Sequence, residues 1–143
     1  MIPAEFTECY ELQLAAYKKN RNPGHAERVA DLRTLHRMLV DNHDALVDAV
    51  NKDFGCRCAF ETKFAETFMA QDATLDAIKH LKKWMKPIRR HLDPTQFPLA
   101  RPWTFPQPVG VVGVVVPWNF PIAMAFQPLI GIIAAGNGAM IKM

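Results

Sequence analysis

Two polar side chains near the end of the chain, Asn119 and Lys142, stand beside long apolar runs. Asn119 follows a valine-rich run and is held between Trp118 and Pro121. An amide fixed in this way can direct its N–H₂ group into a crevice and stabilise an oxygen that becomes negatively charged, an effect of ~3 kcal/mol. Asparagine is also a favoured helix N-cap, so the residues alone leave open a structural role as the cap of the following helix.

Lys142 ends an apolar segment, and an unpaired ammonium group is costly to bury. Its side chain is therefore expected to reach either solvent or a phosphate or hydroxyl group of a ligand. Both interpretations place the ammonium group at an exposed edge, and only the second gives Lys142 a function.

A strand, a turn, a helix, a second turn and a second strand are predicted to position these side chains, at 109–116, 117–121, 122–135, 136–138 and 139–142. The first run is rich in β-branched residues without polar alternation, which predicts a central parallel strand buried on both faces. Pro121 suits the first position of the helix, and Gly136-Asn137-Gly138 can end it with positive φ. The pattern predicts a βαβ unit, and such sheets bind ligands at the carboxyl ends of their strands.

The run PVGVVGVVVPWNFP, followed by LIGIIAAGNGAMIKM, resembles the first cofactor-binding segment of the aldehyde dehydrogenase superfamily. A tryptophan-asparagine pair after a valine-rich strand, an alanine-alanine-glycine-asparagine turn and a lysine ending the second strand occur in order. Segments 53–55, 82–87 and 141–143 look closest to the coniferyl aldehyde dehydrogenase branch. The fold class implied is α/β, with an amino-terminal helical layer before the first βαβ of an atypical Rossmann-like dinucleotide-binding domain.

The resemblance implies a role for each residue at the predicted edge. Asn119 would stabilise the oxyanion of a thiohemiacetal, and Lys142 would hydrogen-bond the adenosine ribose of NAD or NADP. Val116, Pro117 and Trp118 would line the dinucleotide, although core packing at a strand end explains Val116 equally well. The glycines of the strand form no GxGxxG fingerprint, which agrees with the atypical cofactor binding of this superfamily.

The choice between NAD and NADP stays open in the sequence. Met143 stands where many members of the superfamily have proline. The acidic position that helps to select NAD over NADP is not among these residues.

By resemblance, the complete enzyme oxidises a small aldehyde, with aromatic aldehydes such as coniferyl aldehyde favoured by the branch. A cysteine thiolate attacks the carbonyl, hydride passes to NAD or NADP, and a glutamate activates water. Neither the nucleophilic cysteine nor the general-base glutamate is expected among these residues. Cys9, Cys56 and Cys58 lie in no segment that resembles the nucleophile region. Because the chain stops at Met143, inside an expected strand, we expect an amino-terminal portion that is inactive alone. The alternative is a non-catalytic, truncated binding or association module.

Composition favours the cytoplasm and gives little support to nucleic-acid or membrane partners. The formal net charge is only +3, and the three cysteines are an odd count without a signal peptide, which favours a reducing compartment. The only long apolar run, 109–135, is interrupted by prolines and glycines, so no membrane span is predicted.

Apolar residues at helical spacing predict four helices before the βαβ unit. They run over about 7–20 and 26–40, from a cap at Asp41-Asn42 to Phe54-Gly55, and from Phe60 to about Met85. The apolar stripe of the last helix is Phe60, Phe64, Phe68, Leu75, Ile78 and Leu81. We expect these helices to form layers that cover a sheet.

The segment between Pro87 and Pro108 is rich in proline, and its extended pieces, 96–99 and 101–105, are expected at sheet edges. By resemblance it supplies strands for subunit association, and the family suggests a homodimer. The predicted organisation is therefore a helical part of the cofactor-binding domain at 1–90, an extended segment at 91–108 and a truncated βαβ at 109–143.

Three further groups of residues are interpreted as structural. Cys56-Arg57-Cys58 is too tightly spaced for a structural zinc site, so no metal is expected. Glu61 and Glu66 are expected on a solvated helix face. The basic run Lys79–His91 is interpreted as the end of a surface helix, where cations meet the helix dipole favourably. Nucleic-acid binding by this run is the weaker alternative, and a lack of binding at low salt would exclude it.

Overall fold

The computed structural model describes residues 4–93 and 95–143. Its elements in chain order are α1 (Ala4–Lys19), α2 (His25–Asp41), α3 (His43–Phe54), α4 (Ala59–Thr62), the π-helical turn η1 (Lys63–Phe68), α5 (Met69–Trp84), β1 (Ile88–Arg89), β2 (Trp103–Thr104), β3 (Val111–Val115), α6 (Pro121–Ala134) and β4 (Gly138–Lys142).

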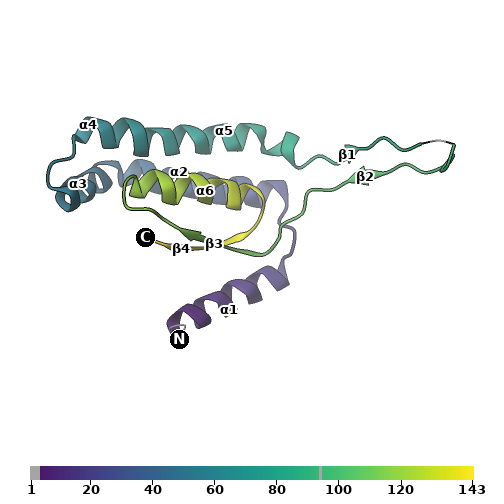
Figure 1. The fold of residues 1–143 in the computed structure, drawn as a ribbon, viewed down its shortest axis with the longest axis horizontal. Coiled ribbons are helices and arrows are strands. Elements are labelled where there is room, and N and C mark those ends of the chain that lie inside the picture. Colours follow the sequence, from purple (N-terminus) through teal and green to yellow (C-terminus); the bar gives the residue numbers. More distant parts are fainter. Residues whose placement is uncertain (1–3, 94) are drawn as a thin grey trace.

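The predicted βαβ unit is confirmed. Strands β3 and β4 pair in parallel, with Val111 opposite Gly138 and Val115 opposite Lys142. Helix α6 connects them and begins at Pro121, whose missing N–H leaves no bond unmade at this position. In Figure 1, α6 lies on one side of this sheet and α1 on the other, and both helices contact the two strands.

The expectation that the first strand is buried on both faces is wrong for this chain. The side chains of β3 are half-buried or exposed, and Val115 is 82% exposed. Among the described residues the sheet has only two strands, and α1 and α6 cover only part of each face. The apolar strand therefore presents uncovered valine surface near its carboxyl end.

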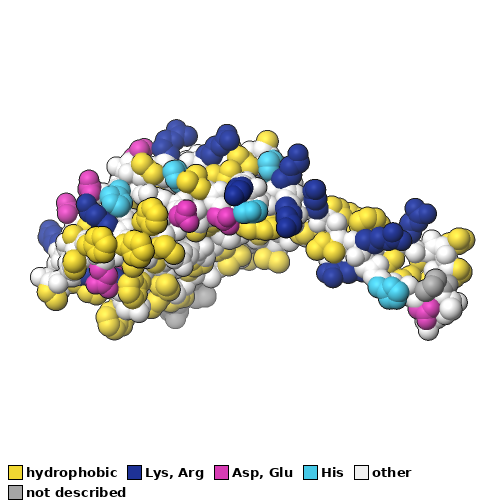
Figure 2. All heavy atoms as spheres, turned by 90° about the horizontal axis from the view of Figure 1, so that it is seen from above, with side chains coloured by type: hydrophobic (Ala, Val, Ile, Leu, Met, Phe, Trp, Pro, Cys, Tyr) yellow, Lys and Arg dark blue, Asp and Glu magenta, His cyan; other side chains and the backbone are white. Residues whose placement is uncertain are grey.

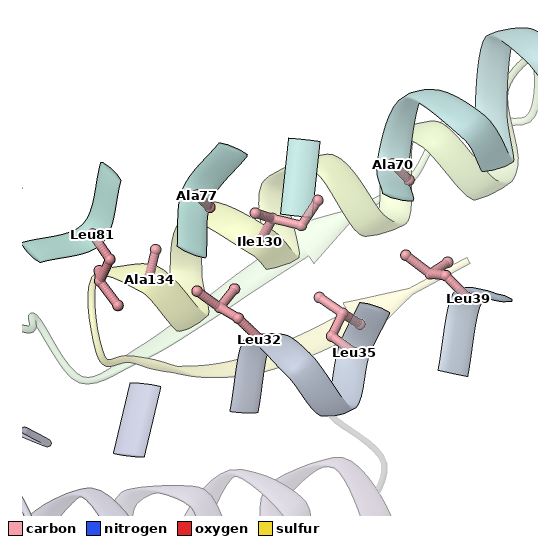
Figure 3. Packing of buried hydrophobic residues seen from close by; sticks show 8 residues of the cluster. All are labelled: Leu32, Leu35, Leu39, Ala70, Ala77, Leu81, Ile130 and Ala134. Carbon is pink, nitrogen blue, oxygen red and sulfur yellow. The ribbon is translucent and has the colours of Figure 1, made fainter. Parts of the chain in front are cut away.

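The main core lies between α2, α5 and α6, which pack against one another. Leucine residues recur at helical spacing along one face of α2. Small side chains of α5 and α6 let the helices approach closely. The buried cluster drawn in Figure 3 consists of Leu32, Leu35, Leu39, Ala70, Ala77, Leu81, Ile130 and Ala134. This layer holds α6, and therefore the turn that precedes it, in a fixed position.

The predicted inward stripe of the long fourth helix is wrong for Phe60, Phe64, Phe68 and Leu75, which are exposed, whereas Ile78 is half-buried and Leu81 is buried. Phe60, Phe64 and Phe68 are exposed, and their rings stack with one another at centroid distances of 6.2 and 6.1 Å. The π-helical turn η1 interrupts the regular helical spacing, so the buried face is made by other residues. These are Thr62, Glu66, Thr67, Ala70, Thr74 and Ala77, and they are joined by Leu81 from the predicted stripe.

The proline-rich segment forms a narrow arm that leaves the helical body (Figure 1). Its strands β1 and β2 are antiparallel, with Ile88 opposite Thr104. The expected extended piece at 96–99 instead contains turns, because the Phe97 N–H donates to the Asp93 carbonyl and the Ala100 N–H to the Phe97 carbonyl. Figure 2 shows Lys and Arg side chains gathered along this arm.

None of the helices found in residues 4–93 and 95–143 combines the length and hydrophobicity needed to cross a membrane.

The carboxyl end of α6 is closed by a buried arginine from α2. The Arg28 Nη1 atom donates to the Ala134 carbonyl at 3.0 Å, and Nε donates to the Pro23 carbonyl at 2.8 Å. Burial lowers the pKa of Arg28 below its ordinary value, because desolvation disfavours the charged form. The chain turns away at Gly136, where φ is +81°, as predicted for the glycine after this helix.

Replacing Gly136 by alanine is expected to lower the free energy of unfolding by about 2 kcal/mol or more. The new Cβ would strain a left-handed backbone and lie 2.7 Å from Cζ of Arg28. Denaturant unfolding monitored by circular dichroism measures the change. Gly131→Ala is the control. Gly131 lies inside α6 with open space around it, so this substitution should raise the free energy of unfolding by about 0.5–1 kcal/mol. Equal stability of the Gly136→Ala variant would contradict the role given to Arg28.

Candidate active site

The predicted site residues lie together at the carboxyl edge of the two parallel strands. The Val116 N–H donates to the Lys142 carbonyl at 2.9 Å, directly after the last paired residues of β3 and β4. Residues 117–119 continue from Val116 as a turn. The parallel register therefore brings the turn before α6 and the end of β4 to one edge.

This edge is open to solvent. Trp118 is 81% exposed, and Pro117, Asn119 and Lys142 are also exposed, whereas Val116 is half-buried. The aromatic, amide and ammonium groups are thus available to a ligand. The half-burial of Val116 is compatible with both of its interpretations.

The side chain of Asn119 does not cap α6. The N-cap residue is Phe120, no side-chain cap hydrogen bond is formed there, and within the described ranges the Asn119 amide makes no hydrogen bond. The structural alternative for Asn119 is therefore wrong. Its N–H₂ group remains free to donate to a ligand oxygen.

The cap of α6 is instead Glu66, from η1. One carboxylate oxygen, Oε2, accepts the N–H groups of Ile122 at 2.8 Å and Ala123 at 3.1 Å. Glu66 is fully buried, so the expectation of a solvated face is wrong for this residue. A carboxylate at a helix amino terminus meets the positive end of the helix dipole.

Arg57 joins Glu66 to the turn that carries Asn119. Its Nη1 donates to the backbone carbonyl of Asn119 at 2.6 Å, and its Nη2 lies 3.2 Å from Oε1 of Glu66. The guanidinium group lies over the rings of Phe54 and Phe120, at 5.0 and 4.5 Å from their centroids. Its side chain is only 6% exposed.

Sequence reasoning missed Arg57 and Glu66 as members of the site. Arg57 was considered only as the middle of a cysteine pair, and the cysteines are exposed free thiols. A signal for Glu66 does exist in the stripe of small residues Thr62, Ala70 and Thr74, which share its four-residue spacing and are buried with it. The aromatic residues at 60, 64 and 68 obscured this stripe.

The comparison with known families agrees with this geometry. The model of the aldehyde dehydrogenase family matches residues 3–143. The chain belongs to the aldehyde dehydrogenase family.

Relatives of this aldehyde dehydrogenase chain include enzymes named for coniferyl aldehyde, as the sequence pattern predicted. A probable coniferyl aldehyde dehydrogenase of Pseudomonas aeruginosa is 44% identical over 131 residues, which are 92% of this chain and 27% of the relative. The coniferyl aldehyde dehydrogenase of Pseudomonas sp. is 43% identical over 115 residues, or 80% of this chain and 23% of the relative. The chain thus spans about a quarter of the length of these relatives.

Solved aldehyde dehydrogenases share the fold. A substrate-bound AldH of Staphylococcus aureus matches with a TM-score of 0.88 and 25% identity, over 99% of this chain and 30% of that protein. The succinic semialdehyde dehydrogenase of Streptococcus pyogenes, in complex with NADP+, matches with a TM-score of 0.85 and 22% identity, over the same shares. The predicted α/β class, with a helical layer and a βαβ unit, is confirmed.

In this aldehyde dehydrogenase chain, the amino terminus of α6 is already occupied by a carboxylate. Many dinucleotide-binding folds place a pyrophosphate on the corresponding helix end. Here Glu66 accepts the N–H groups of Ile122 and Ala123, so they are not available to a phosphate. Side-chain donors at the edge include the Asn119 amide, the Lys142 ammonium group and the indole N–H of Trp118.

A second concave region of the described structure lies elsewhere in the chain. A cleft of about 420 Å³ lies between α1 and α2, lined by residues such as Tyr17, Arg28 and Asn137, and it reaches the amino end of β4 at Gly138 instead of the carboxyl ends of the strands. Across the described part of the chain, no three His, Cys, Asp or Glu side chains are placed to hold a metal ion. The residues singled out from the sequence, Asn119 and Lys142, lie at the open edge and not in this cleft.

Proposed function

We propose that this chain, joined to the remaining length of a family member, oxidises an aldehyde to its carboxylic acid with NAD or NADP. The observation that carries the proposal is the Asn119 amide, exposed at the carboxyl edge of the sheet without a hydrogen bond among the described residues, while its backbone is fixed by Arg57. Similarity to coniferyl aldehyde dehydrogenases supports an aromatic aldehyde as the substrate.

Asn119 acts at the moment when the carbonyl oxygen becomes negative. A cysteine sulfur from outside these residues bonds to the carbonyl carbon, the C=O π electrons move to oxygen, and the Asn119 N–H donates to that oxygen. When the carbon loses hydride, the oxygen reforms its double bond and a thioester remains. Water, deprotonated by a glutamate that also lies outside these residues, then releases the acid and the thiol.

The edge residues fit a nicotinamide dinucleotide. Exposed Trp118 and Pro117 offer flat apolar surface, and the exposed Lys142 offers a donor for a ribose hydroxyl or a 2′-phosphate. When bound, the dinucleotide supplies the hydride acceptor. Solved neighbours described as an NADP+ complex and as an NAD-dependent benzaldehyde dehydrogenase support either cofactor.

We also propose that the arm serves subunit association, in a homodimer. Strands β1 and β2 pair only with each other in the described residues, so their outer edges keep free backbone groups. Exposed apolar side chains such as Trp103 and Phe105 lie on this arm. Both features suit the addition of a strand from another subunit.

The test uses the protein expressed from its complete reading frame. With coniferyl aldehyde and NAD+ or NADP+, we expect one reduced cofactor and one carboxylic acid for each aldehyde consumed, followed by absorbance at 340 nm and by chromatography. Residues 1–143 alone should give no turnover. Binding of the cofactor without turnover by the complete protein would instead support a non-catalytic module.

Replacing Lys142 by alanine in that enzyme is expected to raise KM for the dinucleotide about 10-fold, because a charged hydrogen bond contributes about 1.5 kcal/mol or more. The value of kcat should change little, since Lys142 lies away from the reacting carbon in this proposal. Initial rates at varied cofactor concentration measure both constants. Lys82→Ala, which removes an exposed lysine of α5, is the matched control. An unchanged KM would leave Lys142 as a solvent-facing side chain.

A further inference from the structure

We propose that Arg57 is a positioning residue that fixes the direction of the Asn119 side chain. The proposal rests on the proposed function of Asn119, and it assigns a role in turnover to a residue of the α3–α4 loop that lies far away in the sequence. Arg57 touches neither substrate nor cofactor in this scheme. It acts through the backbone of the turn.

The turn that carries Asn119 has no regular structure to hold it. Residues 116–120 lie between the end of β3 and the start of α6, outside both elements. The bond from Arg57 Nη1 to the Asn119 carbonyl, at 2.6 Å, fixes the plane of the peptide between Asn119 and Phe120. Because the Asn119 side chain has no hydrogen bond of its own in the described structure, this backbone contact is what fixes its Cα–Cβ bond, and with it the set of directions open to the amide.

Arg57 is itself held on three sides. Nη2 pairs with Oε1 of Glu66, while Oε2 of the same carboxylate holds the first N–H groups of α6. The guanidinium carbon also lies over the rings of Phe54 and Phe120. Because both partners of the buried ion pair also bond to backbone groups, we expect the turn, the helix and the guanidinium group to move together.

Lysine cannot replace this arrangement, although it keeps the charge. The planar guanidinium group donates to the Asn119 carbonyl with one nitrogen, pairs with Glu66 through another, and stacks on Phe120 with its face. An ammonium group is a compact point charge and offers no flat face. Arg57→Lys therefore removes the positioning while leaving a positive charge beside Glu66.

The deciding experiment is a double-mutant cycle in the complete enzyme. Arg57→Lys should lower kcat between about 10- and 100-fold, the size of effect expected when a catalytic group is misplaced by about 1 Å, with KM for the cofactor nearly unchanged. In an Asn119→Ala background the same substitution should lower kcat by less than about 2-fold, because the group that Arg57 positions is gone. Equal factors in the two backgrounds would overturn the proposal.

Arg28→Lys is the matched control. Arg28 is also buried and also bonds to α6, but at the opposite end, through the Ala134 carbonyl. The Arg28→Lys variant should have a lower unfolding midpoint and a kcat within about 2-fold of the wild-type value, because Arg28 has no contact with the turn. A similar loss of kcat in both variants would show that Arg57 acts only through general stability.

A second measurement does not depend on activity. Amide hydrogen exchange of Val116, Ile122 and Ala123, whose N–H groups are hydrogen-bonded at the two ends of the turn, should become at least about 10-fold faster in Arg57→Lys, because the turn loses its anchor, and should not change in Arg28→Lys. If the wild-type enzyme oxidises no aldehyde, the proposed function fails, and this measurement still decides the role of Arg57. Unchanged exchange in the turn would overturn that role whatever the activity.

Discussion

Replacing Asn119 by alanine in the complete enzyme is expected to lower kcat by about 10²–10³-fold, the range found when one oxyanion donor is removed. The affinity for NAD or NADP should be nearly unaffected, because the lost amide contacts only the substrate oxygen in the proposed reaction. Stability should also change little, since the side chain is exposed and does not cap α6. Steady-state kinetics, cofactor titration and thermal unfolding measure the three quantities.

Asn20→Ala is the control for the loss of an asparagine. The Asn20 amide is exposed and donates to the Glu27 carboxylate, at the far end of α1 from the sheet edge. The Asn20→Ala variant should have the same kcat as the wild-type enzyme. If Asn119→Ala retained the wild-type rate, the oxyanion role would be excluded, and no capping role would remain to explain the residue.

Replacing Glu66 by alanine is expected to destabilise the fold by about 3–5 kcal/mol, the usual cost of breaking a buried ion pair on one side. The change would leave Arg57 as a buried charge without its partner and two N–H groups of α6 without an acceptor. Denaturant unfolding measures the free energy, and the loss should be large enough to reduce the yield of folded protein.

Glu61→Ala is the matched control, because Glu61 lies 3.6 Å from the same guanidinium group but its side chain is 52% exposed. An exposed pair of this kind contributes less than about 1 kcal/mol. Similar losses of unfolding free energy in Glu66→Ala and Glu61→Ala would contradict the conclusion that the buried carboxylate contributes more to stability than the exposed one.

The βαβ unit could be predicted from sequence because local chemistry determines it. Valine runs favour strands, Pro121 fits the first helical position, and Gly136 supplies the positive φ at which the helix ends. The location of the site at the carboxyl edge of the sheet could be predicted from the topology. Parallel strands joined by one helix must bring Asn119 and Lys142 to the same end of the sheet.

The burial of Glu66 and the position of Arg57 could not be predicted from the sequence, because both depend on tertiary packing. The π-helical turn η1 changes which side chains face inward, so the aromatic residues at 60, 64 and 68 point outward and Glu66 is buried. Arg57 reaches the site because α3 and η1 pack together, which places its loop beside a turn 62 positions further along the chain. Contacts of this range come from the tertiary structure, and pattern reasoning has no access to them.

Helix α6 has no polar side chain of its own at either end, and the side chains that bond to its ends come from elsewhere in the chain, while the N–H groups of Gly136 and Asn137 also donate to the carbonyls of Ile133 and Ile132. Glu66 closes the amino terminus and Arg28 closes the carboxyl terminus. Both residues precede α6 in the chain, so a ribosome produces the partners before it produces the helix. When this very apolar segment leaves the ribosome, both of the side chains that bond to its ends have therefore already been synthesised.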